Sequence, residues 1–201
     1  MITFSENQDA DLIAYEDGIP LAQAHDPKAQ GLKWVYSLGN IPASHVIVMG
    51  LGSGFHIAAL AELDVKLKIT VIETRESLVR VFRSQFPDLS ARVDVLVIEK
   101  PTDIFKTDFF QEILSERPFV LSFQECWGRQ GDLFAELFAH ATGRSLESVK
   151  YHFQEFGIDI KSSFAVPVGL VSLKEMMNSI EASSLRENKK QIFRVLGELV
   201  K

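Results

Sequence analysis

The chain has 201 residues, of which 46% are hydrophobic and 24% charged, and its 21 basic and 27 acidic residues give a net charge of −6. This composition is typical of a globular domain with one full-sized core and argues against disorder of the whole chain. An acidic chain without a basic run lacks the electrostatic footprint of proteins that bind nucleic acid or an anionic membrane surface.

Metal sites, disulfides and export are also disfavoured. The single cysteine, Cys126, excludes a disulfide within the chain and argues against a cysteine-based zinc site. The spacing of His25, His45, His140 and His152 matches no metal-binding motif. The N-terminal segment lacks a signal-peptide pattern, and no apolar stretch approaches the ~20 residues that cross a bilayer. We therefore expect a metal-free protein of the reducing cytoplasm.

Residues 1–42 predict a lead-in hairpin followed by a helix. The dipeptide Asp17-Gly18 separates two apolar runs, which is typical of a hairpin turn. Asp26 suits a helix N-cap and Pro27 suits the first helical position, so a helix is expected from there to about Leu38.

Residues 43–128 alternate short apolar runs with helical segments. Strands are expected at 45–49, 67–72, 93–98 and 119–123, and helices at 55–63, 76–86 and 103–116. This alternation predicts βαβ units with right-handed connections and a parallel sheet. The expected fold class is therefore α/β, with a Rossmann-like parallel sheet flanked by helices.

Residues 129–201 are expected to form a mainly helical cover on the same single domain. Helices are predicted at 131–141, 145–156, 173–183 and 185–200, and residues 164–168 resemble a strand that Pro167 confines to an edge. The last helix carries an apolar stripe that either packs on the sheet or joins two copies in a homodimer.

The first expected strand of the core runs into the loop Gly50-Leu51-Gly52-Ser53-Gly54. Glycine allows positive φ and close approach of a ligand, and the N-terminus of the following helix attracts anions. The loop is therefore either a ligand site or a close crossing of strand and helix. His56, on the first turn of that helix, either donates to a ligand phosphate or carboxylate or is simply packed.

An acid ends the second expected strand. Glu73 follows Gly50 by 73 − 50 = 23 residues. An acid about 20 residues beyond a glycine loop can accept hydrogen bonds from ribose hydroxyls. The alternative is a surface carboxylate paired with Arg75 or Lys68.

The loop and Glu73 together resemble the first motifs of class I S-adenosylmethionine-dependent methyltransferases. Phe55 stands where the dinucleotide fingerprint needs a small residue, so that fingerprint is not met. The resemblance implies a methyltransferase-type fold with S-adenosylmethionine as cofactor. The glycine loop would hold its amino-acid end, Glu73 the ribose, and Glu99, at the end of the third strand, would lie near the adenine. The alternative for Glu99 is a residue at a helix start or in solvent. Val48 departs from the family, which has an acid there.

The stretch after the fourth strand holds the catalytic candidates. Glu125 could act as a general base, because open α/β sheets bind ligands at this edge. Cys126 has no identifiable base and is interpreted as a buried small hydrophobe. Trp127 either stacks on a ligand or fills the core. The run from Ser122 to Gly128 matches no methyltransferase catalytic motif.

Residues 10 to 100 carry a second resemblance, to the N-terminal domain of the motility accessory factor family of flagellin glycosyltransferases. A strand pair, the Asp26-Pro27 helix with Trp34, and a Gly-Leu-Gly-x-Gly-aromatic-His loop occur in the same order. The chain is too short for that family's sugar-transfer domain, so the resemblance implies an accessory domain.

The functional expectation is a protein that binds S-adenosylmethionine or another nucleoside or nucleotide, and a methyltransferase if it is an enzyme. The alternatives are a non-catalytic accessory domain, or a transferase that uses a nucleotide sugar or a pterin.

Overall fold

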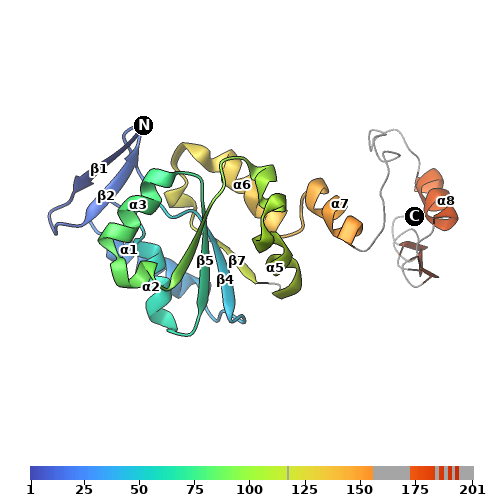
Figure 1. Ribbon diagram of the computed structural model, residues 1–201, viewed down its shortest axis with the longest axis horizontal. Coiled ribbons are helices and arrows are strands. Elements are labelled where there is room, and N and C mark those ends of the chain that lie inside the picture. The colour runs from blue at the N-terminus through green and yellow to red at the C-terminus, as the bar shows by residue number, and fades with distance from the viewer. Residues whose placement is uncertain (117, 156–172, 184–185, 188–189, 192, 195–201) are drawn as a thin grey trace. The chain divides into compact units, whose positions relative to one another are not determined.

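The computed structural model describes residues 1–116, 118–155, 173–183, 186–187, 190–191 and 193–194 (Figure 1). The chain divides into two compact units, residues 1–152 and 153–201. The second unit contains the described helix α8 (Leu173–Ala182). The two sheets and the hydrophobic core described below belong to the first unit.

The larger sheet has four strands, all parallel, in the order β6-β5-β4-β7. The strands are β4 (His45–Met49), β5 (Lys68–Glu73), β6 (Val93–Val97) and β7 (Phe119–Ser122). The strand order reverses between β4 and β7, so the loops that follow these two strands leave in opposite directions. The expected Rossmann-like α/β arrangement is confirmed.

Side chains of β4 alternate between two hydrophobic clusters, one on each face of the sheet. Val46 and Val48 lie in the cluster built with α1, α2 and α3, whereas Ile47 and Met49 lie in the cluster built with α5 and α6. Figure 1 shows these two groups of helices on opposite sides of the strands. A strand buried on both faces is a near-continuous apolar run, as β4 is from Val46 to Met49. The helices are α1 (Pro27–Leu38), α2 (Phe55–Leu63), α3 (Glu76–Gln85), α5 (Asp108–Glu116) and α6 (Gly131–Ala141).

The N-terminal segment forms a three-stranded antiparallel sheet, β1-β2-β3. Its strands are β1 (Ile2–Glu6), β2 (Leu12–Glu16) and β3 (Ile19–Pro20). Asp17 and Gly18 both have positive φ, 48° and 81°, which confirms the expected tight hairpin. Strand β1 was not predicted, because its polar residues alternate with only two large apolar ones.

One predicted helix is wrong in its extent. Residues 103–116 do not form a single helix but a 3₁₀ helix η1 (Pro101–Lys106) followed by α5. Thr107 interrupts them, because its backbone is extended and its hydroxyl donates to the carbonyl of Ile104. The predicted stop at Pro87 is followed by a short helix α4 (Pro87–Ser90).

The remaining helices agree with expectation within one residue, including α7 (Leu146–Glu155). The expected strand 164–168 and most of the expected helix 185–200 lie outside the described residues, and the homodimer stays a prediction. Within the described part of the chain, no helix is both long and apolar enough to cross a membrane.

The packing around Phe134 predicts a large loss of stability on truncation. Phe134 is fully buried, and its ring stacks against Trp127 at a centroid distance of 5.5 Å. Phe134→Ala is expected to lower the free energy of unfolding by about 3–5 kcal/mol in urea titrations. Phe119→Ala, at a ring that is 43% exposed, is the matched control and should cost less than about 1 kcal/mol. Equal losses would contradict the assigned core.

Candidate functional site

The glycine loop joins β4 to α2 at the carboxyl edge of the sheet. Gly50, Gly52 and Gly54 have φ values of 95°, 52° and 86°, all in the left-handed region. Gly54 is also the N-cap residue of α2. The loop conformation therefore requires glycine at all three positions, as the sequence analysis anticipated.

Protein atoms, however, lie against these glycines. A Cβ atom at Gly50 would stand 2.5 Å from Sγ of Cys126, and one at Gly52 would stand 2.6 Å from the carbonyl oxygen of Leu21. At Gly54 it would stand 2.7 Å from the ring of Phe82. The loop thus allows close packing against the turn after β7, the N-terminal segment and α3.

The carboxylate of Glu73 is fully buried and bound internally. It accepts hydrogen bonds from the backbone N–H groups of Leu51 (2.8 Å), Thr74 (2.6 Å) and Arg75 (3.1 Å). Nε of the Arg75 side chain lies 2.8 Å from Oε1 of Glu73. Of the two interpretations of Glu73, the structure places it with Arg75, although in the interior rather than at the surface.

Arg75 joins three parts of the fold. Besides Glu73, its guanidinium donates to Oε2 of Glu16 at 3.3 Å and to the carbonyl of Cys126 at 3.1 Å. Its Cζ lies 5.5 Å from the ring centroid of Phe134. We call Glu16, Glu73 and Arg75 the Arg75 cluster. It ties β2 of the N-terminal sheet to β5 and to the turn after β7. Glu16 carried no sequence signal, because its partner is 59 positions away.

His56 is buried and packed. Its Nε2 donates to the carbonyl of Gly50 at 3.1 Å, and its ring stacks on Phe123 with a centroid distance of 4.4 Å. Burial, only partly opposed by the hydrogen bond to Gly50, lowers the pKa of His56 to about 4. The ring is therefore neutral at pH 7 and offers no positive charge to a phosphate.

The other loop residues face the protein as well. Leu51 is fully buried, and the hydroxyl of Ser53 accepts the backbone N–H of Ala14 at 3.0 Å. Strand β2 therefore lies over the glycine loop. Glu99 is exposed in the bend after β6 and lines neither of the two pockets described below.

Cys126 and Trp127 occupy the point where β4 and β7 diverge. Burial, with a smaller contribution from Glu73, raises the pKa of the Cys126 thiol well above its ordinary value, so the thiol stays protonated. Trp127 donates its indole N–H to the carbonyl of Met49 at 2.8 Å. Both side chains thus belong to the interior, whereas Gln124 and Glu125 of the same turn are exposed.

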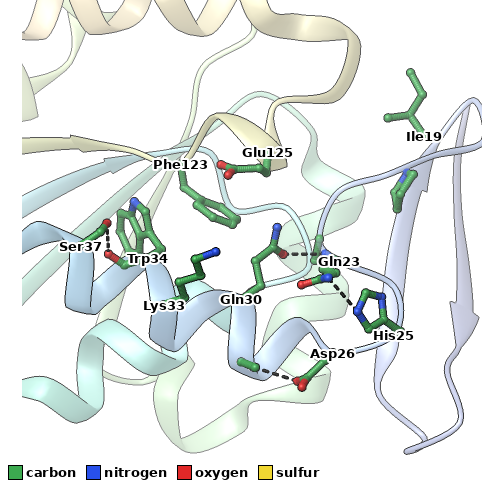
Figure 2. A pocket seen from close by; sticks show the side chains of 13 residues that line it. Ile19, Gln23, His25, Asp26, Gln30, Lys33, Trp34, Ser37, Phe123 and Glu125 are labelled. Atoms are coloured by element: carbon green, nitrogen blue, oxygen red, sulfur yellow. Dashed lines mark hydrogen bonds between the residues drawn. The ribbon is translucent and has the colours of Figure 1, made fainter.

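Beside this point lies a pocket of about 800 Å³, which we call the α1–β7 pocket (Figure 2). It lies between α1, the loop that leads from β3 into α1, and the 3₁₀ turn η2 (Gln124–Cys126) after β7. Its lining residues are Ile19, Pro20, Ala22, Gln23, His25, Asp26, Ala29, Gln30, Lys33, Trp34, Ser37, Phe123 and Glu125. Of the residues singled out from the sequence as site candidates, only Glu125 lines it.

Two amides of this pocket have fixed orientations. Oε1 of Gln30 accepts the backbone N–H of Gln23 at 2.6 Å, so the NH₂ group of Gln30 is left to donate elsewhere. The side-chain NH₂ of Gln23 lies 2.8 Å from Nε2 of His25, so Oε1 of Gln23 is left as an acceptor. The pocket therefore offers both a donor and an acceptor of neutral hydrogen bonds.

Two opposite charges also face this space. Lys33 and Glu125 make no hydrogen bond or ion pair with any residue in the described part of the chain. In Figure 2, the side chains of Lys33 and Gln30 rise from α1 toward Phe123 and the carboxylate of Glu125. These charges are therefore available to a ligand.

Trp34 supplies the aromatic wall. Its indole N–H donates to the carbonyl of Ser122 at 3.2 Å, and its ring lies 5.5 Å from that of Phe123. The ring is half-buried and fixed in orientation. The sequence feature that could have indicated this pocket is the spacing of Asp26, Gln30, Lys33 and Ser37, which a helix places along one polar face beside Trp34.

A histidine at the opposite edge has a triad-like arrangement but no access. Nδ1 of His45 lies 2.9 Å from a carboxylate oxygen of Glu116, and Nε2 lies 3.0 Å from the hydroxyl of Thr70. Thr70 is only 2% exposed within β5, so no substrate can reach its hydroxyl. We interpret this set as a satisfied buried histidine.

The described residues contain no group of three or more His, Cys, Asp or Glu side chains that could hold a metal ion.

A second pocket, of about 790 Å³, lies between α1, α2 and α4. Its lining is mainly apolar and includes Leu32, Phe55 and Phe86.

Because protein atoms crowd Gly52, we predict that replacing it lowers the free energy of unfolding by more than backbone strain alone would. Gly52→Ala is expected to lower the free energy of unfolding by about 1–2 kcal/mol for the left-handed conformation and by about 1–3 kcal/mol more for overpacking. Gly143 also has positive φ, 71°, but has open space around its Cβ position. Gly143→Ala should therefore show the strain alone in urea denaturation. Equal losses at both positions would argue that the loop has room for a ligand.

We predict that the stability of the protein depends strongly on Arg75, the one cation of the Arg75 cluster. Arg75→Met would leave two buried carboxylates uncompensated and should cost about 3–5 kcal/mol of unfolding free energy. The matched control is Arg129→Met, because Arg129 pairs with Asp17 at the surface, 3.5 Å apart. This control should change stability by less than about 1 kcal/mol. A small effect of Arg75→Met would show that the cluster is hydrated.

No protein-family model matches this sequence, and no curated protein matches it. What the geometry establishes is an α/β protein with a four-stranded parallel sheet and interleaved helices, arranged in the Rossmann-like manner, together with a small N-terminal antiparallel sheet.

Proposed function

We propose that this chain is a small-molecule-binding domain whose ligand, a nucleoside or a compound of similar size, binds in the α1–β7 pocket. One observation carries the proposal: polar groups that keep unused hydrogen-bonding capacity among the described residues converge on a half-buried tryptophan at the carboxyl edge of a parallel sheet. Open α/β sheets bind ligands at this edge, beside the point where strand order reverses. The volume of about 800 Å³ falls within the range of small-molecule sites.

The chemistry of the lining favours a ring system with polar edges. The indole of Trp34 offers a flat apolar surface, and stacking of a base on an aromatic side chain contributes about 1–3 kcal/mol. The NH₂ of Gln30 and the Oε1 of Gln23 form a donor and acceptor pair that suits a base edge or ribose hydroxyls. S-adenosylmethionine, the cofactor that the sequence resemblance implies, belongs to this ligand class.

The proposal places the ligand beside the glycine loop and not along it. The glycines pack against Cys126, Leu21 and Phe82, and Glu73 is held by Arg75. This filled loop favours the second candidate function, a non-catalytic accessory domain, over a methyltransferase that grips its cofactor through the loop. The binding proposal requires no reaction and is compatible with an accessory domain.

Calorimetric titration with adenosine and with S-adenosylhomocysteine tests the proposal. Binding of at least one of them is expected, and Trp34→Leu should weaken it at least tenfold through loss of stacking. Tyr36→Ala is the matched control, because Tyr36 lies on the same helix, is 77% exposed and is outside the pocket. It should leave the affinity unchanged.

Circular dichroism would establish that each variant is folded before titration. Binding that survives Trp34→Leu but is lost in Ser53→Ala would move the ligand to the glycine loop. Absence of heat with either ligand at millimolar concentration would remove the nucleoside proposal altogether.

A further inference from the structure

We infer that the α1–β7 pocket selects a zwitterion, that is, a ligand that carries a carboxylate and an ammonium group on the same end, as a free amino-acid moiety does. This inference rests on the proposed function and adds the charge pattern of the ligand. It is carried by Lys33 and Glu125, which line the same pocket from opposite elements, α1 and η2.

The cationic side of the pocket is built for a carboxylate. Lys33 provides an ammonium group, and Gln30, one helical turn before it, provides an NH₂ group whose own carbonyl is already engaged by Gln23. Figure 2 shows both groups directed to the same region. A carboxylate can accept from both donors at once, and charge-assisted hydrogen bonds are the stronger kind.

The anionic side is built for an ammonium group. Glu125 is exposed at the pocket wall and has no hydrogen-bond or ion-pair partner among the described residues. Facing it across the pocket, Lys33 is equally unpaired. A ligand with one charge of each sign satisfies both residues, whereas a ligand with a single charge leaves one of them unpaired.

The same pair disfavours phosphorylated ligands. Among the described residues, the pocket lining contains two acids, Glu125 and Asp26, and one permanent cation, Lys33. The carboxylate of Asp26 accepts the N–H of Ala29 as the cap of α1 and thus adds negative charge at this helix end. A phosphate with two negative charges would be repelled where a zwitterion with no net charge is not. A zwitterionic nucleoside therefore fits better than a nucleotide or a nucleotide sugar.

Calorimetry with three matched ligands tests this inference on the full chain. S-adenosylhomocysteine carries the zwitterion, 5′-methylthioadenosine is a related nucleoside without it, and adenosine 5′-monophosphate carries a phosphate instead. We expect S-adenosylhomocysteine to bind at least tenfold more tightly than either of the other two. Lys33→Met and Glu125→Gln should each reduce that advantage by about fivefold or more, because they lower the affinity for S-adenosylhomocysteine more than the affinity for 5′-methylthioadenosine.

The controls carry the same substitutions at exposed sites on another helix, Lys150→Met and Glu147→Gln in α7. They should leave all three affinities unchanged. Equal affinity for S-adenosylhomocysteine and 5′-methylthioadenosine would overturn the inference and leave the proposed function standing. Tightest binding of the monophosphate, or an advantage of the zwitterion that both pocket variants retain, would overturn it too. No binding of any of the three would overturn the proposed function itself.

Discussion

The rest of the site depends on one interaction, the pairing of the buried Arg75 guanidinium with the carboxylates of Glu73 and Glu16. Placing two carboxylates and one cation in the interior costs several kcal/mol per ion in lost hydration, and only good hydrogen-bonding geometry offsets this cost. Glu73 meets that requirement with three backbone donors and the Arg75 side chain, and Glu16 meets it with Arg75 and the backbone N–H of Arg129. The cluster therefore fixes β2, β5 and the turn after β7 relative to one another.

This fixed arrangement decides where open space remains at the carboxyl edge of the sheet. With β2 lying over the glycine loop and Cys126 packed against Gly50 and Gly52, the centre of the edge is filled. The free volume lies on the α1 side, where the polar face of α1 opposes Glu125. Glu73, at the end of β5, therefore binds the backbone of the glycine loop through the N–H group of Leu51.

The sequence was informative where structure is local and uninformative where contacts join distant segments. The strands of the parallel sheet, the helix that starts at Pro27 and the Asp17-Gly18 hairpin follow from apolar runs, caps and turn residues. The glycine loop was found, but sequence alone did not show that its neighbours are protein atoms, because Cys126 lies 76 positions after Gly50. The α1–β7 pocket was missed for the same reason. Its walls come from β3, α1 and the turn after β7. Of its lining residues, only Glu125 was named as a site candidate, for its position after a strand.

Hydrogen bonds from the two tryptophans limit how far β4 and β7 can separate at the carboxyl edge of the sheet. Trp34 donates to the last carbonyl of β7, at Ser122, and Trp127 donates to the last carbonyl of β4, at Met49. Met49 and Ser122 are the final paired residues of the two strands, directly before the chains part. Each indole therefore binds a carbonyl at the point where the two strands part. Moving the strands apart would leave a carbonyl without a hydrogen-bond donor in apolar surroundings. The separation of β4 and β7 at this edge is therefore limited by two indole N–H groups, that of Trp34 beside the α1–β7 pocket and that of Trp127 in the core.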